Sequence, residues 1–240
     1  MAFKRLMNEL GASERFEVLA ELAGTFSKMP SSGWGYPEGE IEAARLAMPA
    51  LTGGRAGARL PATLVRWWRD VGRVRELTAA QNQLLAPHRL KLHGDIVVIY
   101  TEAQHCALWG IRVEDLAHDD PPVVYLAGES QDQETEALSR FALMVGLFEL
   151  CLSGSGVPCS GHVNERAMEV LRRELHVLPV PTFRWPLAGR ISHFLADDDI
   201  LVLMETYCVF AISTRPDIAE YLMNLAAPGI FQSDGLWEPS

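Results

Sequence analysis

Four segments in a fixed order decide the fold of this chain: LPATLVRWWRDVGR (residues 60–73), QNQLLAPHRL (81–90), HGDIVVIYTEAQHCALWGI (93–111) and DPPVVY (120–125). In the first segment Pro61 suits the first helical turn, and apolar residues recur at helical spacing from Leu64 to Val71. We expect Gly72 to end this helix in a left-handed conformation. The β-branched run at 96–100 follows a His-Gly-Asp turn, and a second run ends at Trp109-Gly110. The segments therefore predict a capped helix, a turn and a hairpin.

Composition limits the classes of partner. The 240 residues carry 31 Asp plus Glu against 21 Lys plus Arg, a formal net charge of -10. This balance argues against direct binding to nucleic acid or to an anionic membrane, and it favours a basic partner. With 48% hydrophobic residues the chain can bury a full core without disulfides or a structural metal. The N-terminal residues lack a secretory signal and the apolar runs are too short to cross a bilayer, so we expect a cytoplasmic protein with reduced thiols.

Patterns outside the four segments predict one domain over residues 1–240. An N-terminal helix is expected over about 13–28, and a helix running to about Leu152 should follow an acidic loop that begins at Glu129. A flexible Gly/Ser break is expected at 153–161. A C-terminal extension, about residues 180–227, is expected to hold short strands at 183–186, 191–195, 200–204 and 206–212 and a last helix near 216–225.

These elements predict an α+β fold. We expect a mixed, mostly antiparallel sheet, flanked by helices, that carries both the hairpin strands and the strands near 191–212. The helix at 61–71 should pack Leu64 and at least one of its two tryptophans against that sheet.

Two loops superficially resemble catalytic motifs. The sequence Ser153-Gly154-Ser155-Gly156 has the wrong spacing for a nucleophile elbow, and the loop at 53–57 lacks the Gly-Lys-Ser/Thr ending that cradles a phosphate. Both are better explained as flexible loops, and we expect no catalytic residue.

Two groups of histidines and cysteines are candidates for a metal or nucleophilic site. His93 and His105 lie beside one hairpin, but no second pair completes a zinc shell, so a turn histidine and a strand-edge histidine are expected. An imidazolium at His162 could activate the thiol of Cys159, although a loop cysteine without a nucleophilic role is the favoured interpretation. We therefore expect no metal and no cofactor.

The order of the segments resembles the SUKH superfamily, whose bacterial members are mostly immunity proteins of polymorphic toxin systems. The resemblance covers about residues 33–150, and Gly33-Trp34-Gly35 before a Glu-rich helix is similar to long actinobacterial-type members. Two positions depart from the family pattern: the turn reads Leu85-Ala86-Pro87, and Gln104 occupies an amide site before Trp-Gly. The motif residues that carry the resemblance are Leu60, Pro61, Trp67, Gly72, Trp109 and Gly110.

The resemblance implies a SUKH-like fold and a non-enzymatic, protein-binding module that neutralises a cognate toxin by direct binding. A housekeeping scaffold or regulator without a toxin partner is the alternative, as in the eukaryotic branch of the family. An enzyme of unrecognised class is a third hypothesis, and it would need a pocket in which several titratable groups converge.

Several residues are candidates for contact with a protein partner. Glu102 and Gln104 lie two apart and should share one face of the strand that leads to Trp109, while Trp68 could reach the surface as an interface anchor. Acidic residues should attract a basic toxin domain such as a nuclease. The acidic candidates are Glu129, Asp132 and Glu134.

Overall fold

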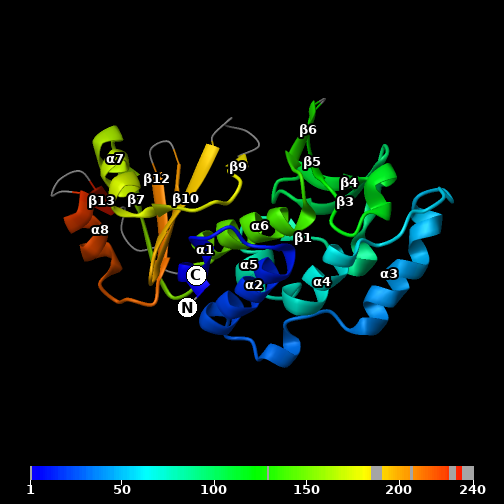
Figure 1. Cartoon of the computed structure of the whole chain (residues 1–240), viewed down its shortest axis with the longest axis horizontal. Helices are drawn as coiled ribbons and strands as arrows, with labels where there is room; N and C mark the ends of the chain where they lie inside the picture. Colours follow the sequence, from blue (N-terminus) through cyan, green and yellow to red (C-terminus); the bar gives the residue numbers. More distant parts are fainter. Residues whose placement is uncertain (1, 129, 185–190, 206–207, 227–230, 234–240) are drawn as a thin grey trace.

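The computed structural model describes residues 2–128, 130–184, 191–205, 208–226 and 231–233 (Figure 1). These ranges combine helices with antiparallel sheets, which confirms the predicted α+β class. The expected N-terminal helix is α2, and its bounds lie within two residues of those predicted. The α-helices are α1 (Ala2–Leu6), α2 (Ala12–Phe26), α3 (Glu38–Leu51), α4 (Ala62–Val71), α5 (Arg75–Thr78), α6 (Leu138–Leu152), α7 (Glu165–Glu174) and α8 (Ile218–Ala226).

The first sheet contains the predicted hairpin. Its strand order is β1-β3-β4-β5-β6. Strands β1 and β2 both pair with β3: β1 pairs with the end of β3 and β2 with its beginning. Trp109 lies opposite Tyr100 on one neighbouring strand and opposite Tyr125 on the other. In the described ranges the strands are β1 (Gln83–Leu84), β2 (Lys91–His93), β3 (Ile96–Thr101), β4 (Leu108–Arg112), β5 (Val123–Ala127) and β6 (Ser130–Thr135).

The second sheet is formed by the C-terminal half of the chain. Its order is β13-β7-β12-β11-β10-β8, and β9 pairs with β10. Strand β10 returns as β11 through a tight turn, in which Asp197 pairs with Ile200. In the described ranges the strands are β7 (Val157–Val163), β8 (His176–Val177), β9 (Phe183–Arg184), β10 (Ile191–Asp197), β11 (Ile200–Met204), β12 (Cys208–Ser213) and β13 (Phe231–Ser233).

The prediction of one sheet for both groups of strands is wrong, because helix α6 lies between two separate sheets (Figure 1). Nearly every side chain of α6 is buried, and the helix contacts strands of both sheets as well as α2, α4 and α5. A helix that is apolar on all sides needs cover on all sides, and one sheet covers a single face. The second sheet and helices α2, α4 and α5 supply the remaining cover.

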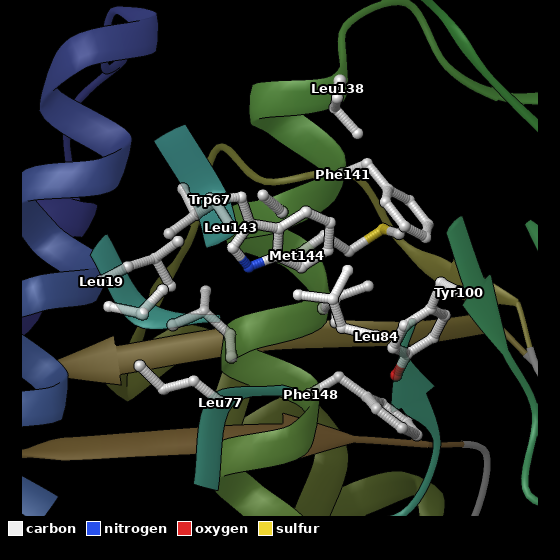
Figure 2. Close-up of a cluster of buried hydrophobic side chains, with 14 of the residues drawn as sticks. Leu19, Trp67, Leu77, Leu84, Tyr100, Leu138, Phe141, Leu143, Met144 and Phe148 are labelled. Carbon is white, nitrogen blue, oxygen red and sulfur yellow. The ribbon is translucent and has the colours of Figure 1, made fainter. Parts of the chain in front are cut away.

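Aromatic side chains fill the space around α6. Figure 2 shows Trp67 and Leu19 on one side of the helix and Tyr100 on the other. The Phe141 ring lies edge-on to Trp67 and to Tyr100, with ring centroids 6.1 and 5.7 Å apart. The cluster of buried side chains to which these rings belong extends from the N-terminal helix into β12.

Helices α7 and α8 cover the opposite face of the second sheet. A separate cluster of buried side chains joins them to the strands, with Met168, Leu171 and Leu222 facing Val202 and Met204. This face explains why β11 is buried throughout. The second sheet is therefore the middle layer between α6 and the α7–α8 pair (Figure 1).

Helix α4 lies where the apolar spacing predicts it. Leu64, Trp67, Trp68 and Val71 are all fully buried. The expected left-handed stop is wrong, because Gly72 has φ −61° and lies in the right-handed helical region. The chain continues there into the short helix α5 after a brief turn, so no left-handed residue is needed.

The Gly33-Trp34-Gly35 segment packs against the last turn of α4. The Tyr36 amide donates to the Trp68 carbonyl at 3.0 Å, and the Arg73 amide donates to the Trp34 carbonyl at 2.8 Å. A Cβ atom at Gly35 would lie 1.9 Å from the Arg69 carbonyl oxygen. Glycine is required at this position because the two backbones touch.

The segment expected as an acidic loop before α6 is largely strand β6, which pairs with β5 along the first sheet. No acidic residue occupies the first turn of α6. Instead, the Asp120 carboxylate accepts from the Ser139 amide at 2.8 Å and from its hydroxyl at 2.6 Å. The negative charge that the helix dipole favours thus comes from the loop before β5.

The segment expected as a flexible break contains strand β7, which lies between β12 and β13. The sequence Val157-Pro158-Cys159-Ser160-Gly161 has low strand propensity, so its own residues do not indicate a strand. Pairing with neighbours distant in sequence overrides that local preference.

Candidate functional site

Glu102 and Gln104 do not share a strand face, which corrects the prediction. They lie in the loop between β3 and β4, and the Glu102 side chain is buried. Its carboxylate accepts from the Gln104 amide at 2.6 Å and from the Cys106 thiol at 3.2 Å. The bond to Glu102 raises the pKa of that thiol. Glu102 therefore organises the loop, and Gln104 is exposed on it.

Trp68 is not a surface anchor, which corrects a second prediction. Its side chain is 0% exposed, and its indole Nε1 donates to the Leu85 carbonyl at 2.9 Å. Both adjacent tryptophans of α4 are buried because the chain covers the helix from several sides. Helices α2 and α6 contact α4, and residues 34–36 lie against its last turn. The turn after β1 covers Trp68 and accepts its hydrogen bond. A partner cannot contact Trp68 without unfolding this region.

Two of the three acidic candidates lie on the outer strand of the first sheet. Asp132 is exposed on β6, and Glu134 is half-buried at an irregularity in the pairing with β5. Glu129 lies outside the described residues. Within the described part of the chain β6 pairs only with β5, so its other edge presents backbone amides and carbonyls.

The six motif residues of the family resemblance are all buried. Four lie in α4 or directly beside its ends, and two lie in β4. Gly110 has a clear physical requirement, since a Cβ there would lie 2.5 Å from the Val97 carbonyl oxygen. These residues hold the first sheet and α4 together, and of the six only Leu60 also lines a groove. They are Leu60, Pro61, Trp67, Gly72, Trp109 and Gly110.

A groove between α3 and the start of α4 was not anticipated from the sequence. It has a volume of about 480 Å³, and its lining combines three arginines with three apolar residues. The arginines come from separate elements, so no motif spacing could have revealed them. The lining residues are Arg45, Arg59, Leu60, Ala62, Val65 and Arg69.

Each arginine of the groove is paired with a carboxylate of this chain. Arg69 contacts both oxygens of Glu38 at 2.9 Å, Arg59 contacts Asp119 at 2.8 Å, and Arg45 pairs with Glu42. These pairs are about half exposed. Exposed ion pairs contribute about 0–1 kcal/mol each, so a competing carboxylate can displace them at small cost.

A buried carboxylate joins α6 to the first sheet. Glu149 is 0% exposed and accepts from the Gln81 and Asn82 amides at 2.6 and 3.0 Å, and from the Tyr100 hydroxyl. Burial raises the pKa of Glu149 above 4.5, against the opposing effect of these hydrogen bonds. Burial, together with Glu149, also raises the pKa of Tyr100 well above 10. The sequence signal was a single acidic residue inside an otherwise apolar helix.

The raised pKa of Glu149 predicts a pH-dependent stability. The folded state holds the proton more tightly than the unfolded state, so this contribution is present below pH 4.5 and is lost as the pH rises. We expect the free energy of unfolding of the wild type, relative to Glu149→Gln, to fall from about pH 4.5 toward neutrality. Urea unfolding of both proteins across that range measures the difference. A relative gain by the wild type at higher pH would contradict the direction.

In the described ranges the histidines and cysteines form no metal-binding cluster. His93 and His105 lie at opposite ends of β3, which rules out the metal grip between them. The Cys208 thiol lies 3.6 Å from His162 Nδ1 across β12 and β7, and the Cys159 side chain falls outside the described ones. In the described ranges no three His, Cys, Asp or Glu side chains are grouped to hold a metal ion.

Comparison with known proteins gives no match to a family model, a curated protein or a solved structure. The function must therefore be inferred from the residues of the chain itself. None of the helices in the described ranges combines the length and apolarity needed to cross a bilayer.

Proposed function

We propose that this chain is a non-enzymatic, cytoplasmic protein-binding module, and specifically an immunity protein that neutralises a toxin by direct binding. The exposed outer strand β6 is the observation that carries the proposal. The resemblance of residues 33–150 to the SUKH superfamily and the net charge of −10 support it.

Strand β6 has the two properties that a protein-recognition edge needs. Among the described strands it is the outermost of the first sheet, so its outer edge can add one strand of a partner through main-chain hydrogen bonds. Its side chains from Ser130 to Gln133 are exposed and polar. They therefore suit a reversible contact better than a permanent apolar interface.

Charge supports a basic partner. Asp132 and the neighbouring Glu136 are exposed on or beside this strand, on a protein that is acidic overall. Complementary charge steers the encounter and raises the association rate, while dissociation depends on buried contacts. A basic toxin domain, such as a nuclease, fits this description.

Charge reversal on β6 tests the surface. We expect Asp132→Lys to slow association with the basic toxin domain that this protein neutralises roughly three- to ten-fold at low salt, and to change the dissociation rate little. Because screening weakens the attraction, the effect should shrink at high salt. The matched control is Glu169→Lys on the exposed face of α7, which changes the net charge equally. Equal slowing by both variants would assign the effect to net charge and not to β6.

Co-expression tests the role itself. If a toxin is encoded next to this gene, cells that produce it should survive only with this protein present. Equal survival without it, and no complex at low salt, would remove the immunity role and leave a scaffold or regulator that binds another protein.

A further inference from the structure

The groove between α3 and α4 is lined by arginines, whereas the exposed side chains of β6 are polar or acidic. In Figure 1, β6 lies at the top of the view, whereas α4 lies near the bottom and α3 at the right. The guanidinium groups of Arg45, Arg59 and Arg69 line the groove, on a chain whose net charge is −10. Each guanidinium is held by one carboxylate of this chain, so the groove gathers three exposed ion pairs around one hollow.

The floor of the groove is apolar. Leu60 and Val65 are nearly fully buried at its base, and Ala62 is exposed beside them. Next to Arg45 on α3, Leu46 is 73% exposed, the most exposed of the large hydrophobic side chains in the described ranges. Arginine heads around an apolar floor suit a ligand that has both carboxylates and an apolar side chain.

The chemistry of the lining selects binding over catalysis. Arginine stays protonated at every physiological pH, so it cannot serve as a general base, and it presents several N–H donors that match a carboxylate in a bidentate geometry. The intramolecular partners Glu38, Glu42 and Asp119 already occupy these donors. They show the kind of group that the groove accepts, and their exposure makes them exchangeable.

We propose that this groove binds an acidic segment of another protein, with an apolar side chain on the Leu60–Val65 floor and carboxylates on Arg45, Arg59 and Arg69. The partner's carboxylates replace Glu38, Glu42 and Asp119 in the ion pairs. The groove is distinct from the β6 surface, so this proposal stands or falls independently of the toxin-binding role.

Peptide binding to the full chain tests the proposal. The probes are fluorescein-labelled, helix-forming dodecapeptides in which one Leu or Phe is flanked by glutamates three or four residues to either side, and the same peptides with glutamine. Anisotropy at low salt should show binding of glutamate peptides at least ten-fold tighter than of their glutamine counterparts. The preference should weaken as salt is added.

Two variants with opposite expected effects on peptide affinity distinguish a binding site from a purely structural group of ion pairs. Arg69→Ala should weaken glutamate-peptide binding about ten-fold, whereas Glu38→Gln should strengthen it about three-fold by removing the internal competitor. Arg166→Ala on α7, an exposed arginine on another face, is the matched control and should have no effect. All three positions are exposed, so an unchanged urea midpoint is expected for each.

Three results would overturn the proposal. One is equal binding of glutamate and glutamine peptides, including the absence of binding by both. Another is a loss of affinity in both Arg69→Ala and Glu38→Gln. The third is displacement of the peptide by low-millimolar inorganic phosphate, which would assign the groove to phosphate groups instead.

Discussion

Replacing Trp109 with alanine is expected to lower the free energy of unfolding by about 3–5 kcal/mol. The indole is 0% exposed and contacts four aromatic rings. Its centroid lies 5.2 Å from Tyr100 and 5.4 Å from Tyr125 in the first sheet, 6.3 Å from Phe141 on α6, and 5.6 Å from Phe183 on β9. Truncation therefore removes packing between the first sheet, α6 and a strand of the second sheet. Urea unfolding followed by circular dichroism measures the loss.

Two variants check the explanation for Trp109. Trp109→Phe keeps a ring in the cavity and should lose less than half as much stability as the alanine variant. Trp34→Ala removes an indole that is only partly buried, so its effect should also be smaller. An unchanged denaturation midpoint in Trp109→Ala would show that this side chain does not bridge the two sheets.

Replacing Glu149 with alanine is expected to destabilise the fold by about 3 kcal/mol or more. The carboxylate satisfies the Gln81 and Asn82 amides and the Tyr100 hydroxyl inside the core. Removing it leaves these three donors without their acceptor, and each unsatisfied buried group costs about 1–3 kcal/mol. Release of the burial penalty on the carboxylate offsets part of this loss.

Tyr100→Phe is the matched control for Glu149. It removes one donor and keeps the ring against Phe141, so we expect a loss of about 2 kcal/mol, smaller than that of Glu149→Ala. Chemical unfolding at neutral pH compares the two. A larger loss in Tyr100→Phe would mean that the hydroxyl, and not the carboxylate, holds this cluster together.

Local patterns predicted the elements whose residues carry a strong signal. The apolar spacing of α4, the β-branched run of β3 and the apolar run of β11 indicate burial and conformation within a few residues of sequence. The same signals failed for β6, which is polar, and for β7, which contains Pro158 and Gly161. Those strands form because partner strands supply hydrogen bonds and cover, which no local window contains.

The candidate binding residues were harder to predict than the fold. Helical spacing shows that Trp67 and Trp68 point about 100° apart, but only the packed structure shows that both directions are covered. Alternation placed Glu102 on a strand face, whereas the chain leaves the strand one residue earlier and the carboxylate turns back onto its loop. The three arginines of the groove, Arg45, Arg59 and Arg69, are separated in sequence. They line one groove because α3 packs on α4.

The sequence by itself determined the α+β class, the central apolar helix and the acidic charge, because these depend on composition and on periodicity within short segments. Only the tertiary structure decided that the strands divide into two sheets around α6, that Gly35 must lack a side chain, and that three arginines line one groove. Each of these features arises from contacts between residues far apart in the chain. Such contacts are set by the packing of surfaces against one another, which local spacing does not encode.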